Sequence, residues 1–490
     1  MATSDLFQGE HETSYGEKLI DYPFTGKDIF VISDLHIAAG LNSNGNYTGN
    51  ENFFADQSFR RFIDHLIDIN ANNPSLLVIN GDLVDFLRIC EIPETDQDFL
   101  QWSDVLNNIG IYKSVTQLKE SINKKERKYG FKTDDYKSVW RLYRCSRGHR
   151  QVFESLAKWL LSGHKLIIVK GNHDLEWYWK PVRDCMRLLL AERISAINNL
   201  STENALTHIV FPNLTFIDDN FMVNKNIYIE HGHRYEHFTC VDGAPLLANG
   251  TELNLPFGSF FNRYLINRVE LAYPFIDDVR PRENILPVLI QERFPLAIKL
   301  LFCYVPFALL VIPKKQYKYA LKYLFQFILM VVVPVAIVVF VFLRLIPVKI
   351  NLSSSNGIIQ FLASGVKSAA LLILSYFLSR LFAMLKLSPP AGLFKNAKDK
   401  FEEHKAVQVV IFGHTHDPEQ LDHSHPAKRY YNTGTWIPVF ETDAADVRLD
   451  KTYTYLHLVQ DGQNEIAETC LMRWNDDALR GDALALMERK

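Results

Sequence analysis

The chain has 490 residues, a formal net charge of −3 and 48% hydrophobic residues, so it is long enough for two or three domains and too nearly neutral for general nucleic-acid binding. Its six cysteines show no paired spacing, which argues against a disulfide-stapled secreted protein and suits a reducing compartment. The first 28 residues carry charges throughout and contain no apolar run, so we expect no signal peptide there.

Five apolar runs predict buried strands, and each one ends in a short cluster of residue types that bind metals. The runs cover 28–33, 75–80, 165–170, 226–230 and 406–412. The clusters that follow them, in the same order, are Asp34-Leu35-His36, Gly81-Asp82 with Asp85, Gly171-Asn172-His173-Asp174, His231-Gly232-His233 and Gly413-His414-Thr415-His416. Because an α/β sheet presents its ligands at strand ends, we expect these clusters to meet.

The residue types in the clusters fit a two-metal hydrolytic site. Such a site needs a carboxylate to bridge the ions, imidazole and amide ligands to complete each shell, and open positions for water and a phosphoryl oxygen. A single Asp-x-His or Gly-Asn-His-Asp run is more often a turn with local backbone contacts, but five clusters in one order make coincidence a poor explanation. The mixed ligands favour manganese, with iron and zinc as alternatives.

The remaining histidines of interest have weaker patterns. His233 and His237 lie beside His231, where the sequence favours solvated or supporting roles over ligation. His423 and His425 are predicted to lie in an exposed loop.

Two helical insertions are predicted between the clusters, at 91–147 and 175–224. The second begins with the aromatic group Trp177, Tyr178 and Trp179, which could line an acyl or nucleoside pocket, although core packing is the commoner use of such residues. The aromatic-rich segment 238–292 is predicted to be a surface region that carries substrate toward the site.

The region before the last cluster is predicted to contain a transmembrane hairpin. Its apolar stretches predict crossings at 322–344 and 368–386. The segment 300–313 is too short to span a bilayer and is predicted to be interfacial or re-entrant. Clusters on both sides must meet around one site, so the number of crossings must be even. Lysines flank the hairpin and only Lys349 lies in its loop, so the positive-inside rule predicts a multi-pass membrane protein with a cytoplasmic catalytic domain.

The predicted organisation is therefore one catalytic domain interrupted by membrane segments. Its parts are a first catalytic segment at 26–293, a membrane region at 294–400, a closing catalytic segment at 401–475 and a tail at 476–490. The closing segment contains two predicted strands, 452–459 and 465–474, with Asp461-Gly462 at the turn between them.

In order and content, the five clusters resemble those of the calcineurin-like binuclear metallophosphoesterases. The resemblance implies a β-sandwich flanked by helices, here interrupted by the transmembrane hairpin. It also implies the ligands of one metal ion, which are Asp34, His36, Asp82 and His416. Asp82 would bridge to a second ion, whose other ligands would be Asn172, His231 and His414.

The same resemblance implies roles for three residues that do not bind metal. His173 would face the phosphate as proton donor or charge stabiliser, and Asp174 would orient it, since a catalytic imidazole needs a partner that fixes its tautomer. Asp85 would support the ligands from outside.

The function implied is hydrolysis of a phosphoester or pyrophosphate, in which a hydroxide held between the ions attacks phosphorus and His173 protonates the leaving group. A lipid-linked substrate at the cytoplasmic membrane face is the leading candidate. The cluster spacing is similar to that of the UDP-2,3-diacylglucosamine pyrophosphatases, which usually carry Arg where His173 stands. Two alternatives stay open: a phosphodiesterase acting on a soluble nucleotide with the hairpin as anchor only, and a catalytically inactive membrane scaffold. The sequence predicts no oligomeric state.

Overall fold

The computed structural model describes residues 3–7, 19–47, 50–273, 279–280, 285–305, 321, 365, 393–422, 428–441, 446–447 and 451–484. The chain divides into two compact units. One consists of Met1–Ala308 together with Gly392–Lys490, and it contains all five clusters. The other is Leu309–Ala391, of which Leu321 and Gly365 are described.

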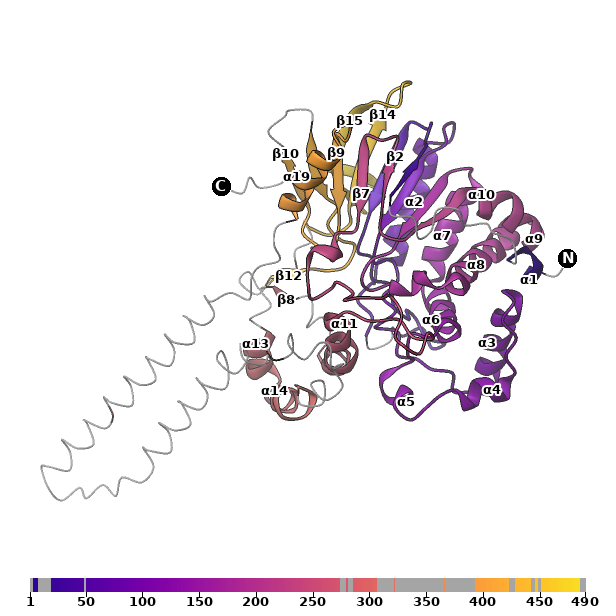
Figure 1. The fold of residues 1–490 in the computed structure, drawn as a ribbon, viewed down its shortest axis with the longest axis vertical. Coiled ribbons are helices and arrows are strands. Elements are labelled where there is room, and N and C mark those ends of the chain that lie inside the picture. The colour runs from indigo at the N-terminus through magenta and orange to yellow at the C-terminus, as the bar shows by residue number, and fades with distance from the viewer. Residues whose placement is uncertain are drawn as a thin grey trace, which may run out of the picture. The chain divides into compact units, whose positions relative to one another are not determined.

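A seven-stranded mixed sheet has the order β16-β15-β14-β2-β3-β4-β5 (Figure 1). Its parallel strands are β2 (Asp28–Ile32), β3 (Leu76–Asn80), β4 (Lys165–Val169) and β5 (Leu214–Ile217). Its antiparallel strands are β14 (Thr454–Gln460), β15 (Ile466–Asn475) and β16 (Arg480–Ala483). The four parallel strands are almost entirely buried, which explains why their sequences are continuous apolar runs.

A six-stranded mixed sheet has the order β1-β6-β7-β9-β11-β10. The strands are β1 (Ile20–Tyr22), β6 (Asn220–Val223), β7 (Ile227–Glu230), β9 (Val409–Phe412), β11 (Arg429–Asn432) and β10 (Glu419–Asp422). At its centre β7, β9 and β11 run parallel. A small third sheet joins β13 (Asp446–Val447), β12 (Phe440–Glu441) and β8 (Val279–Arg280).

The two large sheets pack face to face over one apolar core. Alternation along each strand decides which side chains enter it. In β2, Ile29 and Val31 point to the other sheet, while Phe30 and Ile32 point to the helices. The inter-sheet core also includes Val78, Ile167, Ile229, Ile411 and Leu456.

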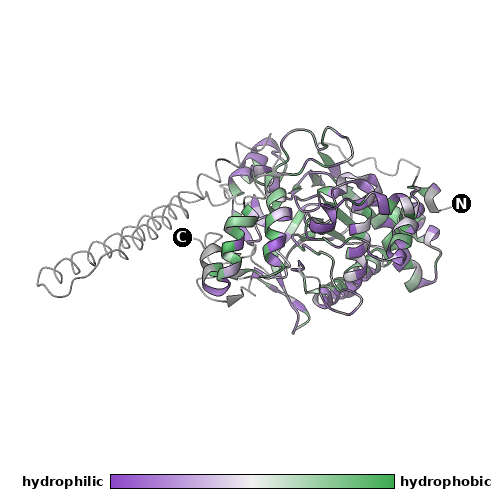
Figure 2. Ribbon diagram, turned by 90° about the horizontal axis from the view of Figure 1, so that it is seen from below, coloured by the Kyte–Doolittle hydropathy of each residue, from purple (hydrophilic) through white to green (hydrophobic). Residues whose placement is uncertain are grey.

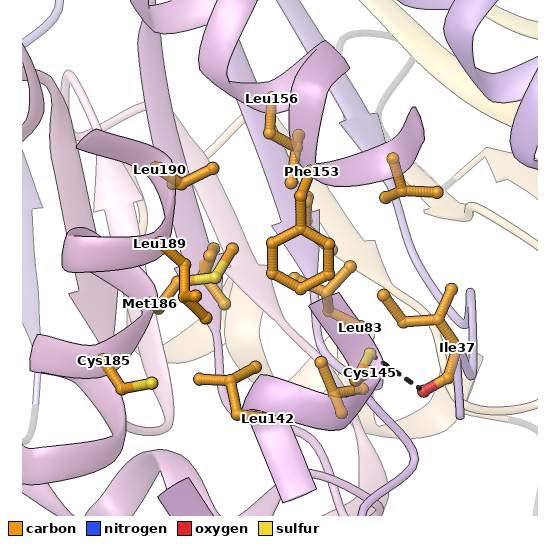
Figure 3. Packing of buried hydrophobic residues seen from close by; sticks show 14 of the residues in the cluster. Ile37, Leu83, Leu142, Cys145, Phe153, Leu156, Cys185, Met186, Leu189 and Leu190 are labelled. Carbon is orange, nitrogen blue, oxygen red and sulfur yellow. Dashed lines mark hydrogen bonds between the residues drawn. The ribbon is translucent and has the colours of Figure 1, made fainter. Parts of the chain in front are cut away.

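Helices cover the outer face of the seven-stranded sheet. They are α2 (Asp56–Ile69), α6 (Asp135–Gly148), α7 (Arg150–Leu161) and α8 (Lys180–Asn198). Figure 3 shows Cys145 of α6, Phe153 of α7 and Met186 of α8 packed together with Ile37 and Leu83. These last two residues each follow a candidate metal ligand in the sequence, so the core fixes the loops that carry the ligands.

The two predicted insertions are largely helical. The first contains α3 (Asp96–Asn108), α4 (Val115–Glu120), α5 (Glu126–Tyr129) and α6. The second contains η1 (Leu175–Tyr178), α8, α9 (Thr202–Ala205), η2 (Leu206–Val210), α10 (Phe211–Asn213) and strands β5 and β6. Trp177 is fully buried against Phe86 and Phe216, which is core packing, the commoner of the two uses considered.

The described residues contain α19 (Phe394–Glu403) and several shorter helices besides those already named. On the outer face of the six-stranded sheet, α19 buries Ala397 and Phe401 against Tyr228 and Tyr430. The others are α1 (Thr3–Leu6), η3 (His233–Tyr235), α11 (Phe257–Phe261), η4 (Asn262–Ile266), α12 (Asn267–Glu270), α13 (Ile285–Glu292), α14 (Phe294–Lys299) and η7 (Leu300–Tyr304). Figure 2 shows hydrophobic and hydrophilic residues mixed along the helices that surround the sheets, as amphipathic helices require.

The predicted transmembrane hairpin is corrected by the helices that the structure describes. None of them is long and apolar enough to cross a bilayer. The longest, α8, has 19 residues but carries six charged side chains. The ranges 322–344 and 368–386 lie outside the described residues, as does 306–313 of the segment expected to be interfacial. The predictions of a hairpin-interrupted fold and of a multi-pass membrane protein at the cytoplasmic face are therefore wrong as made. The architecture is a mixed α/β fold with two large mixed sheets.

Candidate metal centre

Five strands from the two large sheets place the candidate ligands together. Neighbouring parallel strands β2, β3 and β4 lead into Asp34, Asp82 and Asn172. In the other sheet, β7 and β9 are parallel neighbours and lead into His231 and His414. Because the carboxyl ends of parallel strands share one edge of a sheet, the loops that follow all five strands converge there.

The backbone turns sharply at these loops. Five candidate ligands have positive φ angles: Asp34 (55°), His36 (49°), Asp82 (53°), His414 (70°) and His416 (60°). They are five of the eleven non-glycine residues with this conformation in the described part of the chain. Left-handed backbone costs about 1–2 kcal/mol for an ordinary residue, and its concentration here is typical of a functional site.

Three glycines allow the loops to approach each other. A Cβ atom at Gly81 would lie 2.3 Å from Nδ1 of His231, and one at Gly171 would lie 2.1 Å from Oδ1 of Asp82. At Gly413 the nearest atoms are Ser33 Oγ at 2.7 Å and Asp34 Oδ2 at 2.8 Å. In these three clusters the leading glycine is therefore required by the packing of one cluster against another.

Asp34, His36 and His416 form the first group of side chains that could hold a metal ion. Nε2 of His36 lies 3.0 Å from Nε2 of His416. Oδ1 of Asp34 lies 3.3 Å from Nε2 of His416 and 3.7 Å from Nε2 of His36. Metal–ligand bonds of about 2.1 Å place neighbouring ligand atoms about 3 Å apart, so these separations suit donors around one ion.

Asp82, His231 and His414 form another such group. Oδ2 of Asp82 lies 3.1 Å from Nε2 of His231 and 3.7 Å from Nε2 of His36, which places this carboxylate between the two groups. Both sequence neighbours of Asn172 contact Asp82. Gly171 is closely packed against its carboxylate, and the backbone N–H of His173 donates to Asp82 Oδ1 at 2.8 Å. The structure thus brings all seven predicted ligands to one place.

Buried polar atoms at the centre test whether a cation fits. Asp34 Oδ1, Asn172 Oδ1 and His231 Nε2 are buried and make no hydrogen bond within the described residues. Leaving a buried polar atom unsatisfied costs about 1–3 kcal/mol. A cation in the first ligand group would be coordinated by the Asp34 atom, and one in the second group by the Asn172 and His231 atoms. Carboxylate, amide and imidazole donors of this kind suit manganese, iron or zinc. The residues therefore fit a metal ion.

Without a cation the centre is strongly ionic. Burial opposes charge on His231, but Asp82 and Asp34 outweigh it and raise its pKa to about 9. Burial also opposes charge on His36, but the carboxylates of Asp34, Asp85 and Asp82 outweigh it and hold the pKa of His36 well above its usual value. Conversely, despite burial, His231 and other imidazoles lower the pKa of Asp82. Since metal ligands must be deprotonated, a cation that binds here displaces protons from these imidazoles.

The residue that orients His173 is Asp85. Nδ1 of His173 donates to Oδ2 of Asp85 at 2.8 Å, and the same oxygen lies 3.4 Å from Nδ1 of His36. Asp174, expected to orient His173, instead accepts hydrogen bonds from the backbone N–H groups of Gly171 at 2.6 Å and Leu83 at 2.9 Å. Burial and the nearby Asp82 raise the pKa of Asp174 to about 7. Asp174 therefore ties the loop after β4 to the loop after β3.

Sequence reasoning missed three residues at the centre. Arg88 donates through Nε to Oδ2 of Asp85 at 3.0 Å and pairs through its NH1 group with Glu270, and both residues of that pair are buried. Glu236 lies beside His414, with 3.3 Å between Oε2 and Nε2. Arg88 lies three residues after Asp85, which is a weak signal, whereas Glu236 and Glu270 had no signal that we recognised.

The additional histidines fall in different places. His233 is buried, with its ring centroid 5.5 Å from that of His231 and 6.5 Å from that of His414. Burial and these two imidazoles hold the pKa of His233 well below its usual value. His237 is exposed, and His423 and His425 lie outside the described residues.

No family model matches the chain, and no curated protein matches it. The interpretation of the centre therefore depends on its residues and their geometry.

Proposed function

We propose that the protein is a metal-dependent phosphoesterase that hydrolyses a phosphoester or pyrophosphate bond. The observation that carries this proposal is the position of Asp82, whose Oδ2 lies between an imidazole of each ligand group. A shared carboxylate of this kind suits a pair of divalent cations, for which manganese is our first choice. Cations bound there would polarise a phosphoryl oxygen and lower the pKa of a bound water.

His173 is the proposed proton donor to the leaving group. Its side chain is 18% exposed, against 4% for His36, so it can reach a substrate that enters from solvent. Because Nδ1 donates to Asp85, Nε2 remains for the substrate. Burial opposes charge on His173, but Asp85 and Asp82 outweigh it and raise its pKa, which favours the protonated form that a general acid needs.

Hydrolysis of bis-p-nitrophenyl phosphate by the purified chain, with and without added manganese, tests the proposal. We expect metal-dependent turnover that Asp82→Ala abolishes together with metal binding. His173→Ala should keep its metal and lose about 10²- to 10⁴-fold in kcat. Asp242→Asn, which changes an exposed carboxylate outside the centre, serves as the control and should behave as the parent protein.

The same experiment separates an enzyme from a protein that only binds metal. Full turnover in Asp82→Ala would contradict the assignment of the centre. If the protein bound metal but hydrolysed no phosphate ester, it would be a metal-binding protein, and the enzymatic part of the proposal would be overturned.

A further inference from the structure

Two candidate ligand histidines use their ring nitrogens in the same way. In His231, Nδ1 donates to the backbone carbonyl of Asn80 at 2.7 Å, while Nε2 lies 3.1 Å from Asp82. In His36, Nδ1 faces Asp85 and Nε2 faces Asp34 and His416. In each ring one nitrogen contacts an acceptor outside the ligand groups and the other faces the ligand atoms. An outer acceptor of this kind fixes the tautomer of a metal-binding histidine.

His414 has outer partners on its Nε2 atom. Oε2 of Glu236 lies 3.3 Å from Nε2, and Oγ1 of Thr239 lies 3.4 Å from it. The Thr239 hydroxyl donates to the backbone carbonyl of His233 at 2.8 Å, so its oxygen is left as an acceptor toward His414. Nε2 thus faces two acceptors, and a nitrogen in that position carries the proton. The nitrogen left for a cation is Nδ1.

We propose that Glu236 is a positioning residue of the metal centre: it accepts a hydrogen bond from Nε2–H of His414 and thereby presents Nδ1 of that ring to the second ion. This inference rests on the metal centre of the proposed function. Glu236 acts through His414 and is not itself proposed as a ligand. Within the described residues three groups have donor atoms that all lie within 4.8 Å of one another, and Glu236 belongs to none of them: Asp34 with His36 and His416, Asp82 with His231 and His414, and His36 with Asp82 and His173.

The contact between Glu236 and His414 also joins two loops of the centre. Glu236 lies five residues after His231 on the segment that follows β7, whereas His414 follows β9. The contact therefore holds together the two loops that supply the imidazoles of the second ligand group. Glu236 is 22% exposed in its side chain, so it can be replaced without opening a cavity in the core.

Equilibrium dialysis against manganese, with the bound metal counted by mass spectrometry, tests the proposal. We expect the parent chain to bind two ions. Glu236→Ala should weaken one of them by about 10- to 100-fold, the usual effect of removing an outer partner of a metal ligand, and leave the other unchanged. Glu236→Gln keeps an accepting oxygen and should retain most of the affinity. Asp242→Asn is the control for loss of a carboxylate from the same segment.

A double-mutant cycle assigns the effect to His414. Glu236→Ala should cause no further loss of affinity in a His414→Ala background, because its effect passes through that ring. Thr239→Val gives a second, milder variant if Glu236→Ala does not fold.

Unchanged binding of both ions by Glu236→Ala and Thr239→Val would overturn the inference and leave the metal centre intact. Equal loss of both ions would also overturn it, since the whole centre would then be disrupted. Absence of metal from the parent chain would instead overturn the proposed function together with this inference.

Discussion

Gly81 lies where both its backbone and its neighbour exclude a side chain. Its φ angle is +84°, and an added Cβ would meet the ring of His231 at 2.3 Å. Gly163 has the same φ of +84° with no atom within 4 Å of an added Cβ. The two positions therefore separate backbone strain from steric exclusion.

We predict that Gly81→Ala lowers the free energy of unfolding by about 1–3 kcal/mol more than Gly163→Ala does, because only the first adds overpacking to backbone strain. Urea unfolding of both variants in the presence of a chelator measures the difference. Equal losses would show that the loop carrying Asp82 moves away from His231 at little cost.

The candidate ligands and their hydrogen-bond partners differ in how far they could be predicted from the sequence. The seven candidate ligands could be found from the sequence because they follow five apolar strands, and the chemistry of the residue types is local information. The partner of His173 could not be predicted. Asp174 is its neighbour in the sequence, whereas Asp85 lies 88 residues away and reaches it through the packing of the loops. Glu236 and Glu270 meet their partners through tertiary packing alone.

Among the elements, the junction of α6 and α7 contains a buried charged histidine. Nε2 of His149 lies 2.9 Å from Glu51, and Nδ1 lies 3.0 Å from Asp56 at the start of α2. Glu51 also accepts backbone hydrogen bonds from Ala38 and Gly40, in the loop after His36. This cluster therefore connects three helices with a ligand-bearing loop.

The pKa of His149 predicts how this cluster depends on pH. Burial opposes the charge, but Glu51 and Asp56 outweigh it and raise the pKa from 6.5 to about 10. A raised pKa in the folded state stabilises the protein fully below pH 6.5, and that stabilisation is lost as pH rises toward 10. His149→Ala should cost about 3–5 kcal/mol at pH 6 and clearly less at pH 10.

Chemical unfolding at pH 6, 8 and 10 measures this prediction. The control is His457→Ala, which removes a partly exposed ion pair with Asp28 and should cost about 1 kcal/mol or less. A loss for His149→Ala that stays constant across this range would mean that the ring is neutral in the folded protein.

A second buried pair joins the loop after β3 to α12. Arg88 contacts Asp85 and Glu270, and all three side chains are buried. Arg88→Ala should cost about 3–5 kcal/mol, because it removes the buried positive charge that faces the carboxylates of Asp85 and Glu270. Arg88→Met combined with Glu270→Leu removes both charges and should recover much of that loss. Thermal unfolding compares the stability of the single and the double variant. A double variant less stable than Arg88→Ala would contradict the explanation by buried charge.

The elements themselves could largely be predicted from the sequence. Strands buried on both faces leave continuous apolar runs, so β2, β3 and β4 begin within one residue of their predicted positions. The pairing of β7 with β9 could not be predicted, because sheet register between distant segments leaves no local pattern. Hydropathy alone suggested membrane crossings, and no helix in the described part of the chain meets that expectation.

Across the whole molecule, the centre joins segments that lie far apart in the chain. The first and second groups each combine residues that precede Leu309–Ala391 with a histidine that follows it, His416 or His414. Both large sheets contribute strands to each group. A cation bound there would therefore hold the two sheets and both parts of this unit in one arrangement, and unfolding would release it.

We predict that manganese raises the free energy of unfolding of the whole unit. A ligand that binds only the folded state at 100 times its Kd adds about 2.7 kcal/mol per site. Tm should therefore rise with manganese concentration and fall again when a chelator is added, and differential scanning calorimetry measures both. Asp82→Ala should show no such shift, because its carboxylate serves both groups, whereas Asp242→Asn should respond as the parent chain does. A shift of equal size in Asp82→Ala would place the stabilising ion elsewhere on the molecule.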